Sequence, residues 1–264
     1  MRIQNRDYRT RDILKHVALA LAVAAGLTAG RAQAEAPLTN GLTLHLDASE
    51  PGTMTLSGST VSEWRDLQGS SAMATVRGGT PTLVASGIGG IPTVHFNNSA
   101  WMNDGVNHTA PCTILYVSRE TGGSNGRVLG GSSNNWLMGY HGGQRNRFYF
   151  EGWVYGDGNG STPDTSPHLY VATIPGSGQN STIWAEGTQL AANQNGTQGP
   201  NNLELNGYGN GNELSDCDIS EVLVYNRILT GDELNRVGGY LTVKYSLTTA
   251  YPPPEFNRKA HEPV

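Results

Sequence analysis

The sequence predicts an all-β fold, a two-sheet antiparallel jelly-roll sandwich with a short C-terminal helix, on three observations. Glycine, at 35 of 264 residues, is about twice as frequent as usual, and only 15% of the residues are charged. Short runs of β-branched and aromatic residues alternate with Gly-Gly, Asn-Gly and Asp-Gly pairs, which favour tight turns. The chain lacks the strand–helix alternation that a parallel α/β sheet requires.

The first 34 residues predict a cleaved secretory signal peptide. Basic residues precede an apolar run at 17–27, and Ala32-Gln33-Ala34 follows as a small-x-small cleavage signal. A membrane span needs ~20 apolar residues, so this run is too short to anchor the chain. We therefore expect secretion, to the periplasm or the extracellular space, with cleavage after Ala34.

The charge of the exported chain excludes several partners. Without residues 1–34 it keeps 11 basic and 20 acidic residues, a net charge of −9. Binding to nucleic acids and to anionic membranes depends on lysine and arginine, which are scarce here. We expect a glycan or a cell-surface component as partner, no nucleic acid, and no membrane insertion of the mature chain.

Residues 35–250 read as a single domain built of short strands. The clearest strand patterns are those at 42–46, 93–96, 113–118, 147–155, 168–174, 181–185, 202–205 and 219–225.

A helix is predicted after the last strand. Thr230 and Glu233 form a capping-box pattern, and an apolar stripe follows at Leu234, Val237, Leu241 and Tyr245. Beyond it, residues 251–264 are proline-rich and charged, and we expect this tail to be disordered.

The two cysteines, Cys112 and Cys217, each begin a predicted strand in the exported part of the chain. An oxidising compartment would allow them to form a disulfide if the two strands were neighbours. The alternative is a pair of buried free thiols, and the sequence leaves both open because it does not give the Cα separation.

The segment 147–155 carries the candidate ligand site. Period-two alternation predicts that Phe148, Phe150 and Val154 face the core. The opposite face would then combine aromatic rings and a carboxylate, which suit stacking on a sugar and accepting its hydroxyls. The candidate ligand-binding residues are Tyr149, Glu151, Trp153 and Tyr155.

Several stretches together resemble bacterial laminin-G-like, concanavalin A-like jelly-roll domains. They are residues 41–49 (GLTLHLDAS), 61–66 (VSEWRD), 91–96 (IPTVHF), 218–230 (DISEVLVYNRILT) and 240–245 (YLTVKY). The resemblance covers roughly residues 38–248. It implies a lectin-like sandwich with one concave face and, in many members, a calcium ion at the rim, although no matching calcium-ligand motif is present. No other cofactor is implied.

The favoured function is a secreted, non-catalytic module that recognises carbohydrate or a cell-surface partner through one face of the jelly roll. One alternative is a β-glucanase-type glycoside hydrolase, which the resemblance suggests through Asp216 as nucleophile, Asp218 as orienting residue and Glu221 as acid. A second alternative is a structural extracellular protein with no small ligand.

Overall fold

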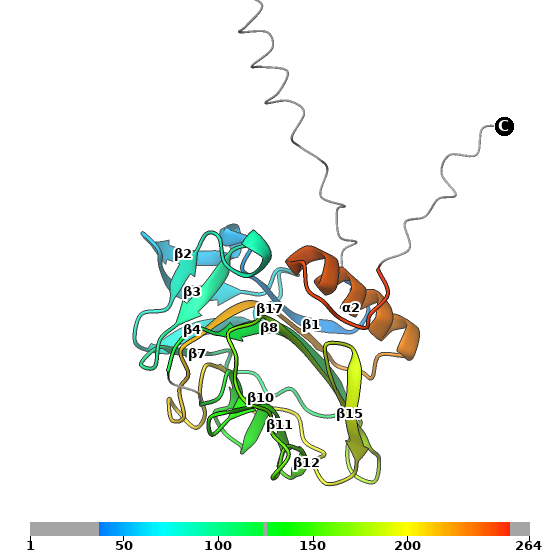
Figure 1. Cartoon of the computed structure of the whole chain (residues 1–264). Coiled ribbons are helices and arrows are strands. Elements are labelled where there is room, and N and C mark those ends of the chain that lie inside the picture. Colours follow the sequence, from blue (N-terminus) through cyan, green and yellow to red (C-terminus); the bar gives the residue numbers. More distant parts are fainter. Residues whose placement is uncertain (1–36, 124–125, 254–264) are drawn as a thin grey trace, which may run out of the picture. The chain divides into compact units, whose positions relative to one another are not determined.

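A computed structural model describes residues 37–123 and 126–253, so the predicted signal peptide lies outside the described residues. Within them the fold is all-β, with seventeen strands and one α-helix, as predicted (Figure 1). The helix is α2 (Gly231–Tyr245), and short 3-10 turns occur at Pro51–Thr53 and Ile88–Gly90. The strands are β1 (Leu42–Asp47), β2 (Met54–Ser57), β3 (Thr60–Arg65), β4 (Met73–Gly78), β5 (Thr82–Val84), β6 (Thr93–Phe96), β7 (Trp101–Asn103), β8 (Cys112–Glu120), β9 (Leu129–Gly131), β10 (Trp136–His141), β11 (Gln144–Phe150), β12 (Trp153–Tyr155), β13 (His168–Ile174), β14 (Ser181–Ala185), β15 (Thr188–Asn193), β16 (Leu203–Leu205) and β17 (Cys217–Tyr225).

The strands form one continuous antiparallel network. It runs from β15 through β14, β13, β8 and β17, and then through β6, β5, β3, β4, β7, β16, β9, β10 and β11 to β12. The two ends of the network meet where Asn193 Nδ2 donates to Val154 O at 2.8 Å. The domain is therefore a nearly closed, flattened barrel. Its strands do not separate into the two predicted sheets, and the jelly-roll strand order stays a prediction.

Two hydrophobic cores explain why β8, β13 and β17 are buried along almost their whole length. On β8, Ile114 and Tyr116 face the barrel interior, whereas Leu115 and Val117 face α2. Figure 1 shows α2 covering the face of β1, β8 and β17 that is turned away from β10, β11 and β12. Each large apolar side chain buried in this way contributes about 1.5–3 kcal/mol.

The C-terminal helix confirms its sequence prediction in detail. Thr230 caps the helix by accepting from Glu233 N, and Glu233 accepts from Thr230 N, which completes the capping box. All four residues of the predicted apolar stripe are buried. Tyr251, at the start of the predicted tail, is also buried and packs on Gly238, where an added Cβ would lie 2.5 Å from its ring. Residues 254–264 of that tail lie outside the described residues.

The segment 147–155, predicted as a single strand, is in fact a hairpin. Strands β11 and β12 pair antiparallel across a turn at Glu151 and Gly152. Glu151 has a left-handed φ of 57°, and a Cβ on Gly152 would lie 1.7 Å from Asn195 O. Backbone from a distant loop thus approaches the turn so closely that only glycine fits at position 152. The expected burial of Phe148, Phe150 and Val154 is nevertheless confirmed.

The disulfide that the sequence allowed between Cys112 and Cys217 does not form in this structure, in which both are buried free thiols. Strands β8 and β17 are neighbours, but they are antiparallel, and each cysteine begins its strand. Cys217 therefore pairs with Glu120, at the end of β8 opposite Cys112. Eight residues of strand separate the two cysteines by roughly 26 Å, far beyond bridging distance.

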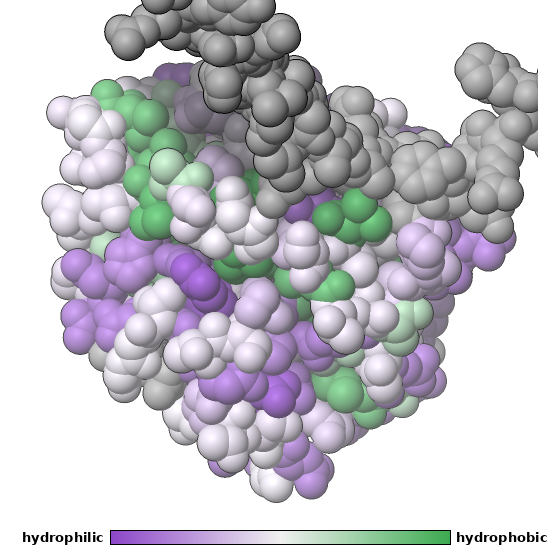
Figure 2. Space-filling model, turned by 45° about the horizontal axis from the view of Figure 1, so that its top comes forward, coloured by the Kyte–Doolittle hydropathy of each residue, from purple (hydrophilic) through white to green (hydrophobic). Residues whose placement is uncertain are grey.

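No helix among the described residues is long and apolar enough to cross a membrane. The face that carries α2 and β2 shows apolar residues in small patches between polar ones (Figure 2). Leu56 and Met73 are the exposed large hydrophobic side chains of the described part of the chain.

Candidate functional site

The outer surface of the β11–β12 hairpin brings two of the predicted ligand-binding residues together. Tyr149 and Trp153 stand directly opposite each other in the antiparallel pair. Their ring centroids lie 5.1 Å apart at an interplanar angle of 74°, an edge-to-face contact that fixes both rings. Both residues are half-buried, so each keeps part of its surface exposed.

Two further side chains extend this pair into a polar and aromatic surface. The guanidinium carbon of Arg147 lies 4.7 Å from the Trp153 ring centroid, and the His141 ring lies 6.2 Å from the same indole. We call Tyr149, Trp153, Arg147 and His141 the aromatic face. It brings together two aromatic rings, a guanidinium group and an imidazole, and the last two can form hydrogen bonds.

Residues from another part of the chain continue the aromatic face. Glu213 Oε2 lies 3.2 Å from His141 Nδ1 and accepts from Arg127 Nε at 2.5 Å. Arg127 in turn stacks 4.0 Å above the Tyr208 ring. Burial lowers the pKa of His141 and, although Glu213 opposes this, the cations Arg127 and Arg147 lower it further. At neutral pH the imidazole is therefore uncharged, able to donate from one nitrogen and accept at the other.

The other two predicted ligand residues lie elsewhere. Glu151 occupies the hairpin turn, where its Oε1 accepts from Asn135 N at 2.6 Å. Tyr155 stands opposite Phe148 and packs against the barrel core. The sequence pattern assumed an unbroken strand, whereas the turn changes the direction of both side chains. Sequence reasoning also missed Glu213, because no local pattern links it to a strand about sixty residues earlier.

The acidic triplet does not form an open catalytic pair. Glu221 is completely buried beneath α2. Asp218 is held by His95 Nδ1 at 2.9 Å and by Arg119 Nε at 2.9 Å, while Asp216 accepts from Asn98 N. A general acid must reach the glycosidic oxygen of its substrate. Glu221 has no such access, so the β-glucanase assignment of these residues does not fit this structure.

Glu221 instead belongs to a buried polar cluster under α2. Its Oε1 lies 2.7 Å from His45 Nε2, and its Oε2 accepts from Lys244 Nζ at 2.7 Å and from Tyr245 at 2.8 Å. Lys244 Nζ also donates to Asp47 Oδ2 at 2.5 Å. Burial alone would raise the pKa of Glu221, but hydrogen bonding from His45 and the charge of Lys244 lower it overall.

The side chains of this cluster include the residue types that bind metal ions, but a lysine already neutralises part of their negative charge. His45, Asp47 and Glu221 offer ligand atoms within 4.8 Å of one another. Calcium prefers six to eight oxygen ligands, and here a histidine and a lysine take up the available space. The Lys244 ammonium group already supplies positive charge between the carboxylates, so the residues present do not fit the calcium ion that the resemblance implies.

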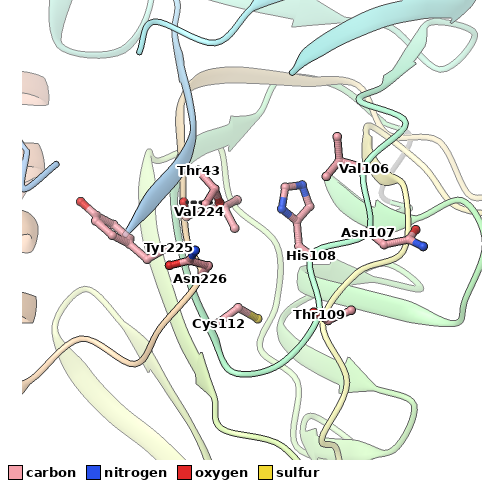
Figure 3. Close-up of a pocket in the computed structure, with 9 residues that line it drawn as sticks. All are labelled: Thr43, Val106, Asn107, His108, Thr109, Cys112, Val224, Tyr225 and Asn226. Atoms are coloured by element: carbon pink, nitrogen blue, oxygen red, sulfur yellow. Dashed lines mark hydrogen bonds between the residues drawn. The ribbon is translucent and has the colours of Figure 1, made fainter. Parts of the chain in front are cut away.

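A cavity of about 170 Å³ opens at the rim of the barrel. His108 stands within it, between Val106 on one side and Thr43 and Val224 on the other (Figure 3). Its Nε2 lies 2.6 Å from Asp104 Oδ2, which fixes the orientation of the buried ring. The cavity is lined by Thr43, Val106, Asn107, His108, Thr109, Cys112, Val224, Tyr225 and Asn226. Burial raises the pKa of the Cys112 thiol to about 12, so this cysteine is a packing group rather than a nucleophile.

Comparisons with known proteins support the fold. No family model matches the sequence, and no curated protein is significantly similar to it. Domain 4 of AbnA, a GH43 extracellular arabinanase from Geobacillus stearothermophilus solved in complex with arabinotriose, matches with a TM-score of 0.52 and 12% identity, over 75% of this chain and 98% of that domain. The binding domain of Paraclostridial Mosquitocidal Protein 1 matches with a TM-score of 0.49 and 12% identity, over 76% of this chain and 52% of that one. Trypanosoma rangeli sialidase in complex with sialic acid matches with a TM-score of 0.47 and 17% identity, over 80% of this chain and 34% of that one. The chain therefore shares the overall β fold of the arabinanase domain.

Proposed function

We propose that this chain is an exported carbohydrate-binding module of the laminin-G-like, concanavalin A-like type, which binds a glycan without cleaving it. The observation that carries the proposal is the aromatic face, where Tyr149 and Trp153 are held edge to face beside Arg147 and His141. The fold shared with the arabinanase domain, which was solved with arabinotriose, supports the same class of ligand.

The chemistry of the aromatic face suits a neutral sugar. The apolar side of a sugar ring stacks on an indole or phenol ring, and its hydroxyls need both donors and acceptors nearby. Arg147 donates, the Glu213 carboxylate accepts, and neutral His141 does both. The net charge of −9 after removal of residues 1–34 disfavours strongly anionic glycans.

Binding to neutral polysaccharides, measured by calorimetry with and without calcium, tests the proposal. Trp153→Ala and Tyr149→Ala should each weaken binding by about tenfold or more, because each removes a stacking surface worth on the order of 1–3 kcal/mol. Trp184→Ala is the matched control, since this half-buried tryptophan packs on the opposite side, against the α2 core. Unchanged affinity in both aromatic variants would remove the aromatic face as the site. No retained glycan under either condition would favour the structural-protein alternative.

A reducing-sugar assay tests the absence of cleavage. Incubation of the wild-type protein with any glycan that it binds should release no reducing ends, because Glu221 is buried. Sugar release that disappears in Glu221→Gln would overturn the non-catalytic assignment.

Export is tested separately. The N-terminal sequence of protein recovered outside the cytoplasm should begin at Glu35 if cleavage follows Ala34. An intact first residue on the recovered protein would contradict a cleaved signal peptide.

A further inference from the structure

Lys244 and Asp47 form an ion pair that is almost completely buried. Lys244 Nζ lies 2.5 Å from Asp47 Oδ2, and the two side chains are 13% and 5% exposed. The carboxyl carbon is one C–O bond beyond Oδ2, so it lies no farther than ~3.7 Å from the nitrogen. That is close to the ~3–3.5 Å separation from which an amine attacks a carbonyl.

The choice of lysine at this position is informative. The whole sequence contains fourteen arginines and three lysines, and Lys244 is the only lysine between residues 37 and 253. A cation that serves only to pair with two buried carboxylates is better supplied by arginine, whose guanidinium binds carboxylates bidentately and is more weakly hydrated. Lysine differs in carrying a primary amine that can be acylated. Between residues 37 and 253 the chain thus uses arginine at every other Lys or Arg position and places its one lysine against two carboxylates.

Asp47 is arranged as an acceptor for such an attack. Its Oδ1 accepts two hydrogen bonds from Ser49, one from the backbone N at 2.9 Å and one from Oγ at 2.7 Å. Two donors on one carboxyl oxygen stabilise the negative charge that develops there when a nucleophile adds to the carbon. The other oxygen, Oδ2, faces the lysine and is the one that would leave.

Glu221 is placed to move the protons. Its Oε2 accepts from Lys244 Nζ at 2.7 Å, and its carboxylate lies within 4.8 Å of that of Asp47. His45 orients Glu221 through its Oε1, and the rings of Tyr240 and Tyr245 lie 5.4 and 5.2 Å from Nζ. These aromatic walls keep water away from the Lys244 nitrogen and the two carboxyl groups.

We propose that Lys244 and Asp47 join in an intramolecular amide (isopeptide) bond, with Glu221 as the proton shuttle. Glu221 takes one proton from the Lys244 ammonium and passes it to Asp47 Oδ2, so that the free amine attacks Cγ of a neutral carboxylic acid. The Cγ–Oδ2 bond then breaks, and Oδ2 leaves as water with the second proton taken from the attacking nitrogen. An ammonium and a carboxylate become an amide and a water molecule, and no external reagent is needed.

The bond would tie β1 to the end of α2 across 197 positions of the chain. A cross-link that closes so long a loop restricts the unfolded chain strongly. It would supply a covalent cross-link, which the placement of the two cysteines does not allow them to form.

Mass spectrometry of the purified, denatured wild-type protein tests the proposal. The intact mass should be lower by one water than that of the linear chain, and digestion should yield a branched peptide that contains both Asp47 and Lys244. In Lys244→Arg and Asp47→Ala the full mass should return and the branched peptide should be absent. Lys244→Arg keeps the cation, so circular dichroism should confirm that it folds.

Two results would overturn the proposal. One is a wild-type protein of full mass whose Lys244 amine reacts with an acylating reagent after denaturation. The other is a loss of water without a branched peptide, as cyclisation of an aspartate would give. Glu221→Gln should slow bond formation by ~10²–10⁴-fold, the usual effect of losing a general base, so protein of full mass should predominate. Complete cross-linking in that variant would refute the role of Glu221.

Discussion

Nε2 of His45 and Oε1 of Glu221 lie 2.7 Å apart in the buried cluster under α2, although 176 positions separate the two residues in the chain. The contact joins β1 to β17, which are neighbours in the barrel. Before any bond to Lys244 forms, it explains why a buried carboxylate keeps its charge, because hydrogen bonding from His45 and the charge of Lys244 oppose the effect of burial and lower the pKa of Glu221.

Replacing His45 by leucine should therefore destabilise the domain, most clearly above pH 4.5, the ordinary pKa of a glutamate side chain. A lowered folded-state pKa contributes stability above the unfolded-state value, and this stability is lost as the pH falls through the folded-state value. We expect His45→Leu to cost about 1–3 kcal/mol at pH 7, measured by urea denaturation, because Glu221 loses a buried hydrogen bond.

His95→Leu is the control for that prediction. His95 also contacts a carboxylate, Asp218, but its side chain is 35% exposed and Arg119 remains as partner. Its replacement should cost less than about 1 kcal/mol. If both variants lost the same free energy of unfolding, the burial of the His45–Glu221 contact would not explain its contribution to stability.

Glu120 should make the domain less stable as the pH rises. Burial, followed by the nearby carboxylate of Asp164, raises the pKa of Glu120 to about 7. Between pH 4.5 and 7 the folded state then binds more protons than the unfolded state, so stability falls as the pH rises. Glu120→Gln should be more stable than the wild type at pH 8, by up to about 3 kcal/mol, and similar to it at pH 4. The stability of both proteins can be measured by thermal unfolding from pH 4 to pH 8. A difference in stability that stays constant over this range would contradict the raised pKa of Glu120.

Two glycines of α2 should respond oppositely to alanine. A Cβ on Gly238 would lie 2.5 Å from atoms of the Tyr251 ring, whereas a Cβ on Gly231 would meet nothing within 4 Å. Gly238→Ala should therefore destabilise by about 1–3 kcal/mol through overpacking. Gly231→Ala, the matched control, should be neutral or stabilising by up to ~1 kcal/mol, because alanine favours the helix. Stabilisation by both substitutions in thermal melts would show that Tyr251 does not pack on the helix.

The two thiols should be present and unreactive in the folded protein. Burial raises the pKa of Cys112 to about 12 and that of Cys217 well above its usual value, and both side chains are shielded. A chromogenic disulfide reagent should therefore label neither cysteine at pH 8 until denaturant is added, and then label both. A reductant should leave the melting temperature unchanged. Failure of the denatured, unreduced protein to react would indicate a disulfide and contradict the structure.

Local sequence patterns determined much of the fold. The composition and turn pairs predicted an all-β chain, and the capping box of Thr230 and Glu233 marked the start of the one helix. The burial of Phe148 and Phe150 also followed from period-two alternation along β11. These features depend on interactions between residues close in the chain, or on which side of a strand is apolar, and both can be read from the order of residues.

Tertiary structure alone decided the features that depend on direction and on distant neighbours. The antiparallel pairing of β8 and β17 separates Cys112 from Cys217, and a turn at Gly152, closely approached by the backbone of Asn195, divides a segment that reads as one strand. The same pairing of distant strands, with α2 laid across them, buries Glu221 and brings Lys244 to Asp47. A single sequence encodes which residues are apolar, but hydrogen bonds between segments nearly two hundred residues apart exist only once the chain has folded.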